Sequence, residues 1–195
     1  MAPTSSTDLD RSACRTLLSV AREAILHGVE QGGRLILDPS DYGASLEKTG
    51  ASFVTLKKDG KLRGCIGTLQ AYQPLVKDVA DHAYAAAFSD PRFPPLDNDE
   101  LELVEISVSV LGEPDVMEVA DEEDLCRQLK PGIDGLILEC GSLRGTFLPS
   151  VWEILPECHD FVRHLKQKAG LEPGFWSREM QFSRYSTQSF AESEE

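Results

Sequence analysis

Apolar residues recur along the chain with a helical period in four stretches. Residues 8–30 repeat apolar side chains every three or four positions, which predicts an amphipathic helix with one buried stripe. Asp8 or Asp10 can cap its start, and Gly32-Gly33 should end it. The same spacing predicts helices over three further ranges: 74–88, 121–129 and 157–169.

Alternating apolar and polar residues predict strands, and two turn signals predict hairpins. Lys58-Asp59-Gly60 separates two apolar runs, and Cys140-Gly141-Ser142 separates two more. Strands are expected over the following ranges: 53–57, 63–69, 103–111, 136–139, 144–148 and 180–187. Hairpins combined with separate helices indicate an α+β fold with a mainly antiparallel sheet and packed helices. The length fits one domain or two subdomains that share a core.

The segment Lys61 to Leu69 (KLRGCIGTL) concentrates candidate chemistry. Arg63 can clamp a carboxylate or a phosphate through two parallel hydrogen bonds. Gly64 and Gly67 allow a close approach of the backbone to a ligand or to another segment. Cys65 can act as a nucleophile if a neighbouring cation lowers the pKa of its thiol. The segment therefore predicts a site without naming a reaction.

Cys65 has two interpretations on sequence alone. It is either a small buried hydrophobic residue or a reactive thiol. Arg63 stands two positions away, which on a regular strand places it on the same face. His82 lies on the next predicted helix and is the best placed histidine for a Cys-His pair, although an ordinary structural histidine is favoured.

Two further features bear on the site. Leu143-Arg144-Gly145 repeats Leu62-Arg63-Gly64 after a glycine-bearing turn, so the two hairpins could bring both arginines to one place. The proline-rich loop from Asp90 to Pro95 excludes regular structure. Its Phe93 is expected to plug the core, and the alternative is that Arg92 and Phe93 form part of a pocket rim.

Seven ordered segments resemble the AMMECR domain family, whose prokaryotic branch is AmmeMemoRadiSam system protein A. They span about residues 10–188 and are the following: GASFVTL (50–56), LRGCIGTL (62–69), AAAFSDPRFPPL (85–96), ISVSVL (106–111), GIDGLILE (132–139), RGTFLP (144–149) and LKQKAGL (165–171). A short Gly-Arg motif is weak on its own, whereas seven segments in the family's order are specific.

The resemblance implies one α+β domain over residues 8–188, with a larger and a smaller subdomain and a cleft lined by the Cys65 motif. It also implies work with a radical SAM enzyme and a Memo-like protein, as a catalytic or accessory component. The expected site has Cys65 and Arg63 as its reactive residues. Its ligand-binding residues are expected to be Gly64, Ile66, Gly67, Thr68, Arg144, Gly145 and Thr146. The alternative is a non-catalytic interaction module that docks a protein on the glycine-rich strand.

Charge and cysteine content narrow the classes of protein that remain. The formal net charge of −14 disfavours nucleic-acid binding, which usually needs a basic face. No apolar run is long enough to cross a bilayer, and no secretion signal is recognised. The chain has five cysteines and no Cys-x-x-Cys pair, which argues against a disulfide framework and against a structural zinc site. A protein of this kind is expected in the reducing cytoplasm. No cofactor or metal motif is found, and residues 189–195 are expected to form a flexible acidic tail.

Overall fold

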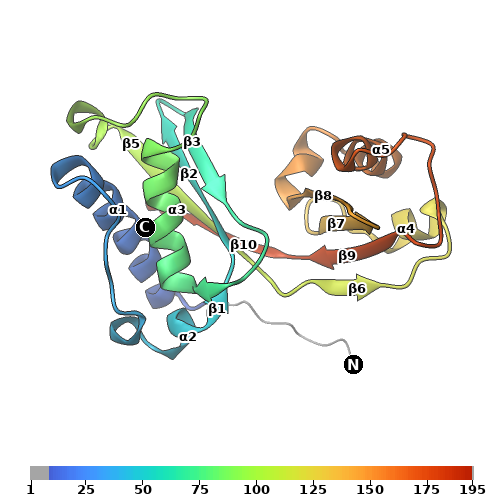
Figure 1. Ribbon diagram of the computed structural model, residues 1–195, viewed down its shortest axis with the longest axis horizontal. Helices are drawn as coiled ribbons and strands as arrows, with labels where there is room; N and C mark the ends of the chain where they lie inside the picture. Colours follow the sequence, from blue (N-terminus) through green and yellow to red (C-terminus); the bar gives the residue numbers. More distant parts are fainter. Residues whose placement is uncertain (1–8, 195) are drawn as a thin grey trace. The chain divides into compact units, whose positions relative to one another are not determined.

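The computed structural model describes residues 9–194, which form two compact units. The larger unit comprises residues 9–111 and 188–194, and the smaller unit comprises residues 112–187. Each unit has its own sheet and its own apolar core (Figure 1). The strands with a described register pair antiparallel, and helices pack beside them. The predicted α+β class is confirmed.

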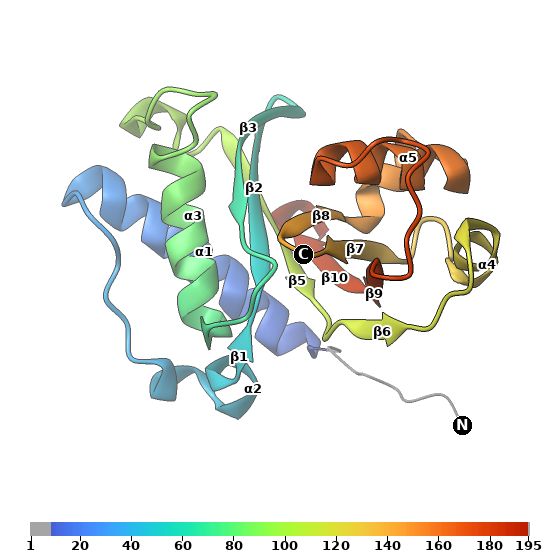
Figure 2. The same cartoon turned by 45° about the vertical axis from the view of Figure 1, so that its right-hand side comes forward.

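In the larger unit, helices α1 (Arg11–Glu30) and α3 (Leu75–Phe88) cover one face of a four-stranded sheet (Figure 2). The strand order is β10-β5-β2-β3, so β3 forms an edge. The strands are β2 (Ser52–Lys58), β3 (Lys61–Gly67), β5 (Val104–Leu111) and β10 (Thr187–Ala191). The short elements are η1 (Pro39–Tyr42), α2 (Ala44–Glu47), β1 (Thr49–Gly50), β4 (Gln73–Pro74), η2 (Asn98–Glu100) and η4 (Glu192–Glu194).

Local signals explain where these elements start and turn. The Asp10 carboxylate accepts a hydrogen bond from the Ala13 N–H and caps α1, whereas Asp8 lies outside the described residues. Asp59 and Gly60 both adopt positive φ, at 52° and 72°, as a two-residue hairpin turn between twisted strands requires. The predicted hairpin of β2 and β3 is therefore confirmed.

Alternation gives the larger unit's sheet two distinct faces. Val54, Leu56 and Ile106 are buried and pack with α1 and α3 on what we call the helix face. Thr55 and Cys65 alternate with them on the opposite side, the outer face, and are only half buried.

The smaller unit also has a four-stranded sheet, in the order β6-β9-β7-β8. Its strands are β6 (Asp115–Met117), β7 (Gly135–Cys140), β8 (Leu143–Phe147) and β9 (Gln181–Tyr185). Its helices are α4 (Glu122–Gln128), η3 (Pro149–Glu153) and α5 (Cys158–Ala169). Trp152 stacks on Phe161 in the core with ring centroids 3.8 Å apart.

The expected flexible tail is largely ordered structure. Residues 187–191 form β10 beside β5, because Phe190 packs against the larger unit's core and Gln188 bonds to the backbone of Leu9. Glu192 continues the order by pairing with Arg22 of α1. Residues 189–194 thus belong to a strand and a short 3-10 helix, the flexibility of this segment stays a prediction, and residue 195 lies outside the described residues.

The argument against disulfides is wrong for one pair of cysteines. Cys126 of α4 and Cys158 of α5 are bonded, with their Cα atoms 5.6 Å apart, a separation usual for a disulfide. A spacing of 32 residues has no local signature, so only the packing of α4 near α5 brings the two together. Cys14, Cys65 and Cys140 are free thiols.

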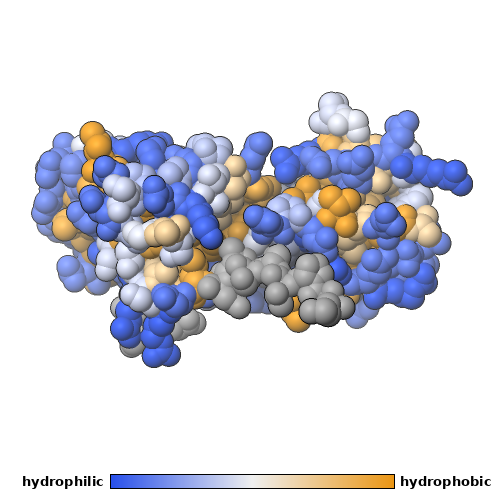
Figure 3. Space-filling model, turned by 90° about the horizontal axis from the view of Figure 1, so that it is seen from below, coloured by the Kyte–Doolittle hydropathy of each residue, from blue (hydrophilic) through white to orange (hydrophobic). Residues whose placement is uncertain are grey.

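Hydrophilic side chains dominate the face shown in Figure 3, with apolar side chains in smaller areas among them. Large exposed apolar residues such as Ile36 and Ile154 come from separate segments, and single exposed residues of this kind are common. Within residues 9–194, no helix combines the length and the apolar character needed to span a bilayer.

Candidate functional site

Cys65 lies on the outer face of β3, opposite Thr55 of β2. The Thr55 hydroxyl donates a hydrogen bond to Cys65 Sγ at 3.3 Å. The thiol is free and half buried, so it is neither locked in a disulfide nor sealed in the core. The structure thus presents Cys65 as a partly accessible sulfur with a hydroxyl donor beside it.

A β-bulge removes Arg63 from the regular alternation of β3. Leu56 pairs with Gly64, but the next residue, Lys57, pairs with Leu62, so Arg63 is the extra residue. A bulge re-aims the side chain of the residue it inserts. The argument that Arg63 and Cys65 share a face therefore loses its basis, because it assumed an unbroken strand.

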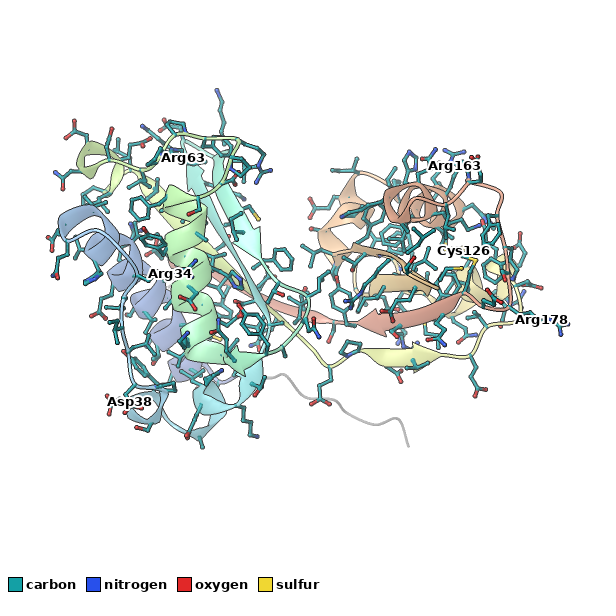
Figure 4. The ribbon with its side chains drawn as sticks, viewed as in Figure 1. Arg34, Asp38, Arg63, Cys126, Arg163 and Arg178 are labelled. Atoms are coloured by element: carbon teal, nitrogen blue, oxygen red, sulfur yellow. A yellow bond between two sulfur atoms is a disulfide. The ribbon has the colours of Figure 1, made fainter. Side chains whose placement is uncertain are left out.

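The Arg63 guanidinium (labelled in Figure 4) is engaged by Glu100 of η2. Its Nε and Nη2 donate to the two carboxylate oxygens at 3.0 and 2.7 Å, and Lys58 adds a contact of 2.9 Å to the same group. The hydrogen bonds from Arg63 lower the pKa of Glu100 to about 2. The same hydrogen bonds raise the pKa of the Arg63 guanidinium. Arg63 Nη1 is buried and has no hydrogen-bond partner among the described residues.

The loop after α3 holds the backbone of Cys65 on both sides. Asp90, which is buried, accepts the Cys65 N–H at 2.9 Å, and Arg92 Nη2 donates to the Cys65 carbonyl at 3.3 Å. Asp90 and Arg92 also pair with each other, through contacts of 2.9 and 2.7 Å. Because β3 is an edge strand, these two side chains occupy main-chain groups that another strand would otherwise use.

The cation that contacts Cys65 is Arg92, which bonds to the backbone carbonyl of that residue from a loop 27 residues further along the chain. Hydrogen bonds to Asp90 raise the pKa of the Arg92 guanidinium. The hydrogen bonds from Arg92 in turn hold the pKa of Asp90 far below its usual range. Arg63, the cation that the sequence expected beside Cys65, pairs with Glu100 instead.

Phe93 lies between the two arginines. Its ring centroid is 5.9 Å from the Arg63 guanidinium carbon and 5.5 Å from that of Arg92. The ring is half exposed. Phe93 is not among the residues that pack on the larger unit's core, so the core plug that the sequence favoured is wrong, and a pocket rim at this place stays a prediction.

Gly64 and Gly67 are required by packing. A Cβ on Gly64 would stand 2.1 Å from the Ala86 carbonyl oxygen of α3, and one on Gly67 would stand 2.4 Å from the Phe53 ring. Backbone approach was the expected role of both glycines, and the partners are a helix and an aromatic ring of the same unit.

Ile66 of β3 and Thr68, which directly follows β3, make structural contacts. Ile66 packs against the larger unit's core, and the Thr68 N–H donates to the Ser52 carbonyl at 3.0 Å.

The second Arg-Gly segment belongs to the smaller unit. Arg144 is exposed and pairs with Glu139 across the hairpin at 3.4 Å. A Cβ on Gly145 would stand 2.9 Å from Ala169 of α5. Thr146 Oγ1 lies 3.2 Å from the Tyr185 hydroxyl. The repeat thus reflects one packing solution used twice, a glycine where a helix rests on a hairpin strand. Convergence of the two arginines stays a prediction.

His82 is separated from Cys65 by the sheet. Its Nδ1 lies 3.1 Å from the fully buried carboxylate of Asp78, which also accepts the Ser52 hydroxyl at 2.7 Å. Ser52 occupies the helix face, because it is two residues from Val54, whereas Cys65 is on the outer face. His82 therefore has the structural role that the sequence favoured.

The expected site residues did not include Asp90, Arg92 and Glu100, although Arg92 was considered as part of a pocket rim. The sequence shows Asp-Pro-Arg in this loop, but no local pattern predicts that Asp90 contacts a strand residue 25 positions earlier in the chain. Within residues 9–194, no group of three or more His, Cys, Asp or Glu side chains is arranged to hold a metal ion.

Comparison with known proteins extends over almost the whole chain. The family model described as AMMECR1 matches residues 18–190. A protein of Methanothermobacter thermautotrophicus is 37% identical over 190 residues, covering 94% of this chain and 96% of the relative. One from Saccharolobus islandicus is 43% identical over 176 residues, covering 87% and 76%. The crystal structure of an uncharacterized protein from Pyrococcus horikoshii matches with a TM-score of 0.84 at 32% identity, covering 94% of this chain and 93% of that one. These matches show that the chain belongs to the AMMECR1 family.

Proposed function

We propose that this protein acts through the Cys65 thiol as a catalytic or accessory component, working in the cytoplasm with a radical SAM enzyme and a Memo-like protein. The observation that carries the proposal is the setting of the sulfur. It is half buried on an open sheet face and accepts a hydroxyl hydrogen bond from Thr55, and the Arg92 guanidinium contacts the backbone carbonyl of the same residue. A hydrogen-bond donor and a cation are the groups that favour a thiolate over a thiol.

The two arginines take different roles in this proposal. Arg63 is buried and tied to Glu100, so it anchors the loop that carries Phe93. The Arg92 side chain is 53% exposed and uses Nε and Nη2 for its contacts, which leaves Nη1 for an anionic group of a substrate. Arg92 would then orient the anion, and Cys65 would supply the reacting sulfur.

The alternative function, a non-catalytic docking module, has one structural feature in its favour. Strand β3 is an edge, and edge strands can accept a partner's strand. Asp90 and Arg92 already occupy the N–H and the carbonyl of Cys65, however, so strand addition there would have to displace a buried carboxylate. Docking by strand addition is therefore the weaker candidate.

The first experiment is the alkylation rate of each free cysteine against pH in the folded protein, read by mass spectrometry. Cys14 is a suitable slow reference, because burial raises the pKa of its thiol and Asp10 adds to the effect. We expect Cys65 to react faster than Cys14 at neutral pH. Reaction of Cys65 only after unfolding would refute a role for the sulfur in chemistry.

One variant and a matched control test whether the Thr55 hydroxyl, rather than the volume of its side chain, sets the reaction rate of Cys65. Thr55→Val removes the hydroxyl and keeps the volume, so we expect Cys65 to react several-fold more slowly at neutral pH. Thr16→Val is the matched control, since that exposed hydroxyl donates to the Ser12 carbonyl within α1 at 3.0 Å. An equal Cys65 rate in both variants would contradict the role of Thr55. Cys65→Ser should abolish partner-dependent activity while leaving partner binding intact, and activity that survives this substitution would favour the docking module.

A further inference from the structure

The Cys126–Cys158 disulfide joins two helices of the smaller unit and has no part in the Cys65 proposal. Figure 4 labels Cys126 and shows the bond in yellow. Cys126 is on the short helix α4, and Cys158 is the first residue of α5. Both residues are half buried rather than sealed in the core. A reductant therefore has partial access to the bond in the folded protein.

Each sulfur has a neighbour that favours the thiolate. Cys158 begins a 12-residue helix whose N-cap, Glu157, makes no side-chain hydrogen bond to the free N–H groups. An uncapped helix N-terminus stabilises negative charge at this position. Cys126 Sγ lies 4.0 Å from Nδ1 of His159.

The two cysteines stand at opposite ends of their helices. Cys158 is the first residue of α5, whereas Cys126 is in the last turn of α4. Glu122 and Glu123 of α4 each lie 3.5 Å from the His159 ring nitrogens, so carboxylates surround the neighbour of Cys126. Asp160 in the first turn of α5 is held by Arg163 at 2.8 Å. Because a helix N-terminus favours negative charge and a C-terminus does not, Cys158 is the better leaving group of the two.

The bond also fastens α4 to a buried cation. Lys166 of α5 is 1% exposed, and its ammonium pairs with Glu122 of α4. The same ammonium lies 5.4 Å from the Trp176 ring centroid and 3.3 Å from the Pro173 carbonyl oxygen. Because α4 has only seven residues, the disulfide is a substantial part of what keeps Glu122 on Lys166. Loosening α4 would change the environment of Trp176.

We propose that Cys126–Cys158 is a thiol–disulfide exchange site that takes a dithiol as its reductant, and that reduction loosens α4 from α5. A thiolate of the dithiol attacks Cys126 Sγ, the S–S bond breaks, and Cys158 leaves as a thiolate at the start of α5. The second thiol of the reductant then attacks the reductant sulfur that is bonded to Cys126, which forms the reductant's disulfide and releases Cys126 as a thiolate. The protein gains two electrons and two protons, and the dithiol becomes a disulfide. Disulfides in reducing compartments are typically exchangeable in this way, which agrees with the proposed cytoplasmic location.

The test uses the whole protein with dithiothreitol as the probe. Samples are quenched in acid, alkylated and mapped by mass spectrometry, while circular dichroism follows the fold and fluorescence follows the tryptophans. We expect Cys126 and Cys158 to be reduced together without loss of the circular dichroism signal, with a change in fluorescence that oxidised glutathione reverses. Reduction only in denaturant, fluorescence that stays constant on reduction, or two free thiols in the air-oxidised protein would each overturn the proposal.

Two further measurements test the assigned direction of attack. In wild type, glutathione should be trapped on Cys126 rather than on Cys158. With single variants, Cys158 in Cys126→Ser should react about fivefold faster with an aromatic disulfide probe than Cys126 in Cys158→Ser. Cys140→Ser is the control and should leave the reduction of the pair unchanged. Trapping on Cys158 would overturn the assignment even if neither serine variant folds.

Discussion

Helix α3 rests directly on the backbone of β3 at Gly64, and Gly64→Ala tests how tightly that contact is set. The added Cβ would stand 2.1 Å from the Ala86 carbonyl oxygen and 3.0 Å from its carbon. An ordinary contact begins near 3.4 Å, so the helix would have to move by about 1.3 Å. Overpacking of this kind costs about 1–3 kcal/mol, and we expect the upper end because the obstacle is backbone rather than a flexible side chain.

The assay is urea unfolding followed by circular dichroism, with hydrogen exchange to locate the effect. We expect Gly64→Ala to lose about 3 kcal/mol of unfolding free energy, with faster exchange in α3 and β3. Gly174→Ala is the matched control, since a Cβ there meets nothing within 4 Å, and it should stay within about 0.5 kcal/mol of wild type. A loss for Gly64→Ala no larger than that of the control would refute the reasoning. The contact also means that a bulky residue at 64 would damage the fold before it tested docking.

Three further predictions concern other contacts. Glu100→Gln leaves the Arg63 charge buried without its carboxylate, so the free energy of unfolding in denaturant titrations should fall by about 2–4 kcal/mol. Glu102 is exposed, so the control Glu102→Gln should leave the free energy of unfolding nearly unchanged. The pKa of Glu100 is lowered from 4.5 to about 2, so the stability that this carboxylate adds to the fold is complete above about pH 4.5 and is lost as the pH falls toward 2. Glu100→Gln should flatten the plot of unfolding free energy against pH in this range. An unchanged slope of that plot would contradict the ion pair. The double variant Cys126→Ser, Cys158→Ser opens a loop of 32 residues and should lower unfolding free energy by about 3–4 kcal/mol, read from the fluorescence of Trp152 and Trp176, which both lie in the same unit as the bond.

Local patterns were sufficient for most helices and hairpins. The helical period located α1, α3 and α5, and the caps came from residues within one turn of each end, such as Asp10 and Gly170. Asp59-Gly60 predicted the β2–β3 hairpin because its backbone preference is a property of the two residues themselves. These features depend on neighbours in sequence, so the sequence is enough to find them.

Strands β6 and β10 were beyond this reasoning. Asp115–Met117 is too short to show alternation, and Thr187–Ala191 has Phe190 as its only large apolar residue. Both are strands because a partner strand offers hydrogen bonds, β9 in one case and β5 in the other.

The candidate site was found by composition and arranged by the tertiary structure. The sequence alone marked residues 63–68 as unusual, because a thiol, a cation and two glycines rarely stand so close together. Only the tertiary structure shows that a bulge frees Arg63 to pair with Glu100. Likewise, only the tertiary structure shows that Arg92 contacts the backbone of Cys65, which lies 27 residues earlier in the chain. Folding likewise bonded Cys126 to Cys158. The physical reason is the same in each case: periodicity and capping are encoded by adjacent residues, whereas these contacts exist only when distant segments pack together and offset the entropy of closing the loop between them.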